Sequence, residues 1–307
     1  MFAVPDGDGT RLGGTHMTVQ DWAALNHQLL RDGVVCVRDA LDGASLELAE
    51  EAYRWSLDNP TSHHKVEAGD ETAGRFYQDF FNPDALSQYR DLLLASSIPD
   101  ILTCIWDSPE VWFMFEHVFV KEGVESRATS WHQDSQDLPL EGSQFATVWL
   151  SFDPISRSEA LEFVRGSHWG VRFAAAARDD AESAGLLPPV PDVDSHRDRY
   201  DIVSYATEPG DLLIFHPALL HGGAPTRAGS RRRTLSMRFY GKDAVYAPRP
   251  GNHGKVGPAN FGADGLQLRP GDPFRHVAFP RVRPREDAAL DAAAEVRRIY
   301  RPVGAAS

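Results

Sequence analysis

The chain has 307 residues, of which 42% are hydrophobic and 10% aromatic, a composition typical of a globular protein with a substantial core. Its 44 acidic side chains outnumber its 31 basic ones, so the formal net charge at pH 7 is −13. This charge argues against nucleic acid or an anionic membrane surface as the main partner.

Composition also indicates a cytoplasmic protein. Cys36 and Cys104 each lie among apolar residues, which favours buried thiols over a disulfide framework or a zinc site. Residues 1–17 contain no apolar segment of the kind found in a signal peptide, and we interpret them as a flexible tail. The longest apolar runs are about ten residues, too short to cross a bilayer.

Residues 18–110 are predicted to form a helical lead-in to a single domain that extends to residue 300. Thr18 can cap a first helix whose apolar side chains share one face: Trp22, Leu25, Leu29 and Leu30. A short buried strand is predicted over 34–38, and further helices over 44–57 and 83–105. An aromatic cluster lies between these last two helices, and we favour core or lid packing over a substrate site for Phe76, Tyr77, Phe80 and Phe81.

From residue 111 the pattern changes to short runs of strand-forming residues separated by Gly and Pro turns. Strands are predicted over 111–121, 146–152, 161–164, 202–205, 211–215 and 232–240. They predict a mainly β core of the sandwich or jelly-roll type over 111–245, flanked by the N-terminal helices. An irregular insert over 172–200 interrupts this core, and C-terminal loops with a last helix follow over 246–300. Loops near 62–82, 172–200 and 246–262 are candidate lids.

The segment Trp131-His132-Gln133-Asp134 carries the strongest chemical signal in the core. On an extended strand, side chains two residues apart leave the same face, so His132 and Asp134 can reach one ion together. An imidazole and a carboxylate are two of the three ligands in the iron site of non-haem Fe(II) oxygenases. His216 and His221 are the candidates for the third ligand, and His221, just before a Gly-Gly turn, is preferred.

A basic residue follows His221 in the chain. Arg232 lies on the last long predicted strand, where its guanidinium can bind a carboxylate through two parallel hydrogen bonds. Such a set leaves open positions on the metal for the keto and carboxylate oxygens of a 2-oxo acid and for dioxygen. Arg231 and Arg233 are adjacent, so a one-residue change of register would bring one of them inward instead.

Over roughly residues 19–245 the chain resembles the phytanoyl-CoA dioxygenase family of Fe(II)/2-oxoglutarate oxygenases. The residues that carry this resemblance are Trp131-His132-Gln133-Asp134, Val148-Trp149-Leu150, Leu161 to His168, Gly210 to Gly222, and Arg232. The resemblance implies a double-stranded β-helix of the jelly-roll, cupin-like type. It also implies that His132, Asp134 and His221 bind Fe(II).

By the same resemblance, Arg232 binds the far carboxylate of 2-oxoglutarate, Trp149 lines the co-substrate pocket, and Lys121 is a polar neighbour of the co-substrate. The expected function is a 2-oxoglutarate-dependent dioxygenase that uses O2 to hydroxylate a C–H bond of a small molecule, as a monomer or homodimer. A substrate with CoA would require basic residues at the entrance, for which the candidates are Arg165, Arg172, Arg178, Arg249 and Arg275.

Several alternatives remain open at this point. A catalytically silent jelly-roll protein could keep the metal site, and a bound Zn²⁺ could support hydrolysis instead. A halogenase or desaturase of the same class is a further alternative, although a halogenase would have a small residue in place of Asp134.

Overall fold

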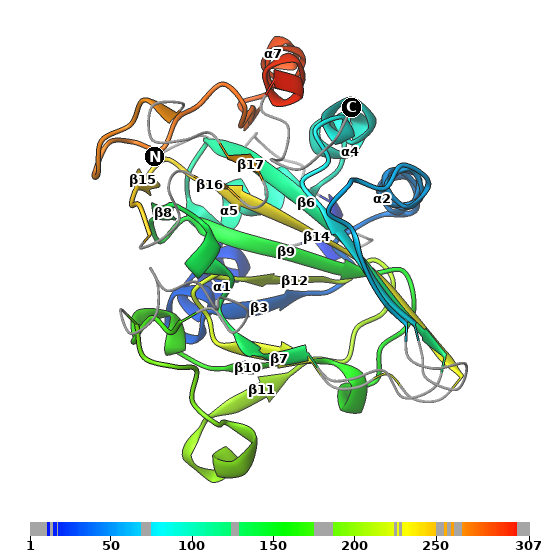
Figure 1. The fold of residues 1–307 in the computed structure, drawn as a ribbon, viewed down its shortest axis with the longest axis vertical. Coiled ribbons are helices and arrows are strands. Elements are labelled where there is room, and N and C mark those ends of the chain that lie inside the picture. The colour runs from blue at the N-terminus through cyan, green and yellow to red at the C-terminus, as the bar shows by residue number, and fades with distance from the viewer. Residues whose placement is uncertain are drawn as a thin grey trace.

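The structure is a computed structural model that describes residues 11–12, 15–16, 18–68, 75–123, 129–174, 187–223, 226, 229–249, 255–256, 259–260 and 266–299. Two antiparallel sheets form its centre. The smaller sheet lies below the larger one in Figure 1, and the helices α2 (Gly43–Asp58), α4 (Arg90–Ala95) and α7 (Asp287–Ile299) lie beyond the upper side of the larger sheet. This arrangement agrees with the predicted β core flanked by helices.

The larger sheet has the strand order β3-β12-β9-β14-β6-β5-β4, with β18 also paired to β6. Its strands are β3 (Val34–Val37), β12 (Leu212–Phe215), β9 (Phe145–Ser151), β14 (Ser230–Tyr240), β6 (Val111–Gly123), β5 (Arg75–Phe80), β4 (Lys65–Ala68) and β18 (Arg281–Arg283). The smaller sheet has the order β11-β10-β13-β7. Its strands are β11 (Ile202–Ser204), β10 (Leu161–Val164), β13 (His221–Gly223) and β7 (Thr129–His132).

Helices cover the outer face of the larger sheet. They are α1 (Val19–Asp32), α2 (Gly43–Asp58), α3 (Ala85–Gln88), α4 (Arg90–Ala95), α5 (Ile98–Trp106) and α7 (Asp287–Ile299). Thr18 caps α1 as predicted, because its hydroxyl accepts from the Asp21 amide and the Asp21 carboxylate accepts from the Thr18 amide. Trp22 and Leu29 are buried against the sheet, whereas Leu30 lies off this face and is 39% exposed.

The helix predicted over 83–105 is instead three short helices, α3 to α5. Ser96 ends α4, where its hydroxyl and its amide both donate to the carbonyl oxygen of Leu92. Pro99 lies in the first turn of α5, where its missing N–H is tolerated, and it disfavours helical geometry in the residue before it. The prediction of one continuous helix was therefore wrong.

Strand β14 separates two kinds of side chain by the two-residue period of a strand. Leu235, Met237 and Phe239 belong to the hydrophobic core beneath the helices. The alternate positions, Arg232, Thr234, Ser236 and Arg238, are polar and buried on the inner face toward the smaller sheet. The larger sheet therefore has an apolar face for packing and a polar inner face.

Several predictions fall on or beside residues that the structure does not describe. Most of the tail 1–17 and residues 175–186 of the insert lie outside the described residues, as do parts of the candidate lids. Two short strands of the tail, β1 (Arg11–Leu12) and β2 (Thr15–His16), pair with each other. No helix among the described residues is long and apolar enough to cross a membrane.

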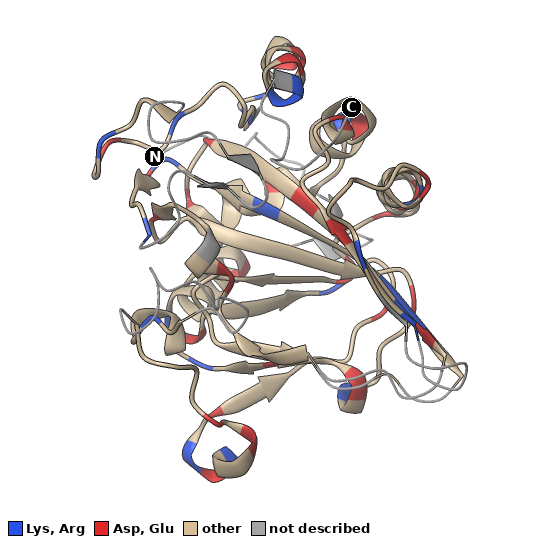
Figure 2. Cartoon of the chain, viewed as in Figure 1, with Lys and Arg blue, Asp and Glu red and all other residues tan. Residues whose placement is uncertain are grey.

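Further short elements are β8 (Leu140–Glu141), β15 (Val245–Tyr246), β16 (Lys255–Val256) and β17 (Ala259–Asn260), and the 3-10 helices η1 (Asp134–Asp137), η2 (Arg157–Glu159), η3 (Ser167–Trp169) and η4 (Asp194–Arg199). In Figure 2 the positions of basic and acidic residues are interspersed along the outer helices and loops.

Candidate metal centre

His132 ends β7 and Asp134 begins η1, with one extended residue between them. That residue, Gln133, is buried on the opposite side of the chain. Its amide nitrogen donates to the carbonyl oxygen of Ala218 at 2.8 Å, and its amide oxygen accepts from the backbone of Phe173 at 3.0 Å. Gln133 therefore fixes the turn that directs His132 and Asp134 to the same side, as the spacing predicts.

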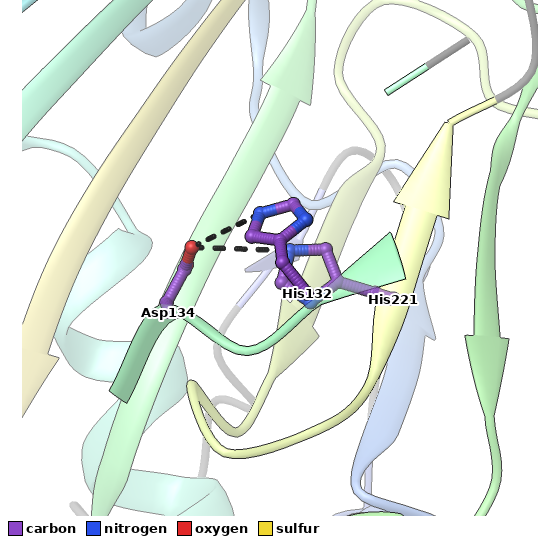
Figure 3. A group of neighbouring side chains, drawn as sticks. All are labelled: His132, Asp134 and His221. Carbon is purple, nitrogen blue, oxygen red and sulfur yellow. Dashed lines mark ion pairs between the residues drawn. The ribbon is translucent and has the colours of Figure 1, made fainter. Parts of the chain in front are cut away.

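His221 reaches the same point from the neighbouring strand. It begins β13, which pairs antiparallel with β7, and the register places His221 directly opposite His132. The Oδ1 atom of Asp134 lies 3.5 Å from Nε2 of His132 and 3.9 Å from Nε2 of His221. One ligand atom from each of the three residues lies within 4.8 Å of the others, and the side chains converge in Figure 3.

Backbone carbonyls determine which imidazole nitrogen faces the centre. Nδ1 of His132 lies 2.8 Å from the carbonyl oxygen of Ser130, and Nδ1 of His221 lies 2.8 Å from that of Leu219. Because a carbonyl oxygen can only accept, Nδ1 carries the proton in the neutral form of both rings, and the lone pair of Nε2 is then available to a metal ion. Metal-binding histidines commonly have this arrangement.

Arg238 and Thr147 hold the other carboxylate oxygen of Asp134. Arg238 donates to Oδ2 at 2.9 Å, and the Thr147 hydroxyl donates to the same atom at 3.2 Å. Arg238 is buried and also donates to the Ser236 hydroxyl. The Oδ1 atom that faces both imidazoles is thereby left to a metal ion. Sequence analysis missed both supporting residues, although Arg238 stands on the same alternating face as Arg232.

The charges at the centre favour an ionised carboxylate. Burial raises the pKa of Asp134, but the Arg238 charge and the hydrogen bond from His132 outweigh it and hold the pKa well below the usual range. Burial and the neighbouring His132 lower the pKa of His221 to about 4. Burial also acts to lower the pKa of His132, but the hydrogen bond to Asp134 raises it overall. A divalent cation can take the place of the proton shared by His132 and Asp134.

The structure distinguishes among the three consecutive arginines. Arg232 is buried on the inner face, and its Nη1 donates to the carbonyl oxygen of Glu159 at 2.5 Å. Arg231 is exposed, and Arg233 binds Asp153 and Glu50 on the outer side. Burial lowers the pKa of Arg232 to about 10, so its guanidinium stays charged at neutral pH.

Lys121 lies directly opposite Arg232 in the pairing of β6 with β14. Side chains at directly opposed positions share one face of a sheet, so two buried cations lie side by side. The Lys121 ammonium donates to the Thr129 hydroxyl at 3.1 Å. Thr129 precedes His132 on β7 by three residues, about 10 Å along a strand. Lys121 and Arg232 thus lie on the same inner face as the metal centre but displaced from it along the strands.

Trp149 lies on the same face of β9 as Thr147, which contacts Asp134. It is 6% exposed and packs in a hydrophobic cluster with Phe163 and Phe215 between the two sheets. This position is compatible with a pocket wall and with ordinary core packing.

The other candidate histidine lies away from the three converging side chains. Nε2 of His216 lies 3.0 Å from the carbonyl oxygen of Gly142, and Nδ1 accepts from the Ala218 amide. Among the residues that the structure describes, the group that could hold a metal ion does not include His216.

A family model described as phytanoyl-CoA dioxygenase (PhyH) matches residues 29–234. The human protein named phytanoyl-CoA dioxygenase, peroxisomal, is 26% identical over 168 residues, which are 51% of this chain and 48% of that protein. A probable phytanoyl-CoA dioxygenase of Caenorhabditis elegans is 25% identical over 174 residues, 54% of each chain. The chain spans about half the length of the curated relatives it matches.

Solved structures with other reactions share the fold. The epimerase SnoN, in complex with Fe3+, alpha ketoglutarate and nogalamycin RO, has a TM-score of 0.62 at 20% identity, over 86% of this chain and 99% of SnoN. The carbocyclase SnoK has a TM-score of 0.61 at 18% identity, over 90% of this chain and 100% of SnoK. These likenesses confirm the predicted fold class, with sheets that do not close into a barrel. Because the family model covers more than half of its length, the chain belongs to the phytanoyl-CoA dioxygenase family.

Proposed function

We propose that this protein is an Fe(II)- and 2-oxoglutarate-dependent dioxygenase that hydroxylates an unactivated C–H bond of a small organic molecule. In this reaction one oxygen atom of O2 enters the product as a hydroxyl group. The other enters succinate, which forms from 2-oxoglutarate with loss of CO2. Family membership supports the oxygenase class, and the site residues described above support the assignment of roles.

The proposal rests chiefly on the convergence of His132, Asp134 and His221. Two Nε2 atoms with available lone pairs and one ionised carboxylate oxygen are the donor set that suits Fe(II). When bound there, ferrous iron would activate dioxygen with 2-oxoglutarate as the reductant. The hydrogen bonds from Arg238 and Thr147 would keep Asp134 in place during turnover.

The far carboxylate of 2-oxoglutarate is assigned to Arg232, with Lys121 beside it. A buried guanidinium can bind a carboxylate through two parallel hydrogen bonds, and Lys121 adds a second positive charge on the same face of the sheet. The co-substrate carries one carboxylate for the metal and one for this pair of cations. Trp149 is assigned to the wall of the same pocket.

One alternative within the metal class is disfavoured by a specific residue. A halogenase requires an open position for chloride in place of the carboxylate ligand, and Asp134 occupies that position with its carboxylate fixed by Arg238. Desaturation would use the same site and differs only in the product. The cytoplasmic location and the monomeric or homodimeric state stay predictions.

The test measures succinate formed from 2-oxoglutarate by the protein loaded with Fe(II). We expect formation that requires Fe(II) and O2, is lost in His132→Ala, and is unchanged in His27→Ala, a control at an exposed histidine of α1. With ¹⁸O₂ and a turned-over substrate, both succinate and the product gain one labelled oxygen. Equal, slow consumption by wild type and His132→Ala would instead favour a silent metal-binding protein. Hydrolysis supported by Zn²⁺ without O2 would favour a hydrolase.

A further inference from the structure

Five aromatic side chains cover the inner face of β5 and β6, and we call this set the aromatic wall: Phe76, Phe80, Phe115, His117 and Phe119. The register places Phe76 opposite Lys121 and Phe80 opposite His117. It also places Phe115 opposite Arg238 on β14. Because directly opposed residues share a face, the wall lies on the face that carries Arg238 and Arg232.

The wall is continuous. The rings of His117 and Phe119 are stacked with centroids 3.9 Å apart, and Phe80 lies 4.8 Å from His117. Phe115 lies 6.4 Å from Phe80, and Phe76 lies 6.3 Å from Phe119. These separations fall within or close to the range in which aromatic rings interact.

Both ends of the wall reach residues assigned to the reaction. The Arg238 guanidinium, which holds Asp134, lies 5.2 Å from the centroid of Phe115. The Lys121 ammonium lies 5.2 Å from the centroid of Phe76. A molecule lying on the wall would therefore extend beside the metal centre, where oxidation is proposed to occur.

Apart from Phe115, which belongs to the same buried cluster as Phe81, the wall differs from the surrounding core in its burial. Its neighbours Tyr77 and Phe81 belong to fully buried hydrophobic clusters, as expected from core packing. Phe76, Phe80, His117 and Phe119 are only partly buried. Partly exposed aromatic rings gathered on an inner face next to a metal centre are suited to contact a ligand, because aromatic side chains supply most of the apolar lining of small-molecule sites.

The wall also offers a polar group. Nε2 of His117 lies 3.3 Å from the amide oxygen of Gln78, which stands on the same face of β5. Burial and the Arg238 charge hold the pKa of His117 well below its usual value, so the ring is neutral at pH 7. Donation from Nε2 to Gln78 leaves Nδ1 of His117 as an acceptor, which suits a hydroxyl group on a ligand.

The basic residues considered for a CoA group are already engaged. Arg172 and Arg249 both bind Glu141, at 2.7 and 2.8 Å. Arg165 binds Asp201 at 2.8 Å, and Arg275 lies 3.6 Å over the ring of Trp112. Arg178 lies outside the described residues. Each of these four arginines therefore already has a partner group in this structure.

We propose that the substrate carries a planar conjugated ring with a hydroxyl group, and no diphosphate, and that this ring packs on the aromatic wall beside the metal centre. The inference rests on the proposed function and adds the chemical class of the substrate. The proposal concerns only the part of the substrate that contacts the aromatic wall, where the faces of the aromatic rings are available for stacking.

The test compares two probes that share one carbon skeleton, 2-naphthol and its saturated counterpart decahydro-2-naphthol. Binding to the anaerobic protein with Fe(II) and 2-oxoglutarate is measured by calorimetry. We expect 2-naphthol to bind about three- to tenfold more tightly, the effect of one or two aromatic contacts beyond area burial. Phe119→Leu and Phe80→Leu keep similar apolar volume and should bring this ratio toward one. Val120→Ala, on the opposite face of β6, should retain the ratio.

A second pair of probes tests the absence of a diphosphate group from the substrate. Decanoyl-CoA should bind no more tightly than decanoic acid, and a tenfold preference for the CoA thioester would overturn the proposal. Equal binding of the two naphthol analogues by wild type would overturn it as well. Succinate formation by wild type without added probe is measured in parallel. If it is present while the ring preference is absent, only the substrate class is wrong; if it is absent, the proposed function itself fails.

Discussion

Replacing Arg238 by Met tests how much of the metal affinity comes from a residue that does not touch the metal. The guanidinium donates to Asp134 and supplies the main opposing charge that keeps this buried carboxylate ionised. Methionine keeps much of the length of the side chain and its contact with Phe115 but removes the charge. The carboxylate then loses one of the two hydrogen bonds that orient it, together with its stabilising cation.

The expected loss follows from these contacts. Removing a partner that orients a metal ligand typically weakens metal binding about 10- to 100-fold, or about 1.4–2.7 kcal/mol. Without the Arg238 charge, burial dominates and the pKa of Asp134 rises, so protons compete with the metal at a higher pH than in wild type. Fe(II) affinity should therefore fall more steeply in the variant as the pH is lowered from 8 to 6.

Anaerobic calorimetry of Fe(II) binding at several pH values measures both effects. Arg238→Lys keeps a charge and should recover part of the affinity. Arg233→Met is the control, because this arginine of the same strand binds Asp153 and Glu50 on the outer face, and its loss should leave Fe(II) binding unchanged. An Fe(II) dissociation constant for Arg238→Met within about twofold of wild type, with the same pH profile, would refute this reasoning.

Three further predictions concern other parts of the chain. Arg232→Met should raise the KM for 2-oxoglutarate about 10- to 100-fold with a smaller effect on kcat, since a charge-assisted hydrogen bond contributes about 1.5–3 kcal/mol; an unchanged KM in steady-state kinetics would contradict the assignment. Gly33 has φ +80°, and a Cβ there would lie 2.6 Å from both His168 and Leu219, so Gly33→Ala should destabilise the fold by at least about 1–2 kcal/mol in denaturant unfolding. Gly43→Ala, with no atom within 4 Å of the new Cβ, is the control and should be near neutral. Burial and the neighbouring His216 lower the pKa of His168 to about 4, so His168 takes up a proton in the unfolded chain before it does in the folded protein as the pH falls below about 6.5. The free energy of unfolding should therefore fall by about 1–2 kcal/mol by pH 4, allowing for partial solvent exposure. His168→Gln should not show this loss.

The sequence pattern was sufficient to predict the direction of a side chain where that direction depends on one strand or turn alone. The spacing of His132 and Asp134 placed both side chains on one side because Gln133 is extended, as the two-residue period requires. The alternation along β14 likewise separates Arg232 from its two arginine neighbours once the buried apolar positions are known. The first feature depends on a few consecutive residues, so it can be predicted without coordinates, whereas the choice of Arg232 needed the observed burial.

Features that depend on contacts between distant strands could not be predicted in this way. Arg238 lies 104 residues after Asp134, and only the pairing of β14 with β9 brings it beside Thr147 and the metal centre. The division of the helix predicted over 83–105 includes the extended backbone of Ser96, which ends α4. The aromatic cluster was assigned to packing as a whole, whereas β5 places Phe76 and Phe80 on the inner face and Tyr77 on the other.

Because β14 has chemistry on one side and packing on the other, its positions are free to diverge independently. Substitutions at Thr234 and Ser236 would change the polar inner face, whereas substitutions at Leu235, Met237 and Phe239 would destabilise the packing first. The lining beside the metal and co-substrate residues could therefore change within one strand while the same strand keeps its packing beneath the helices.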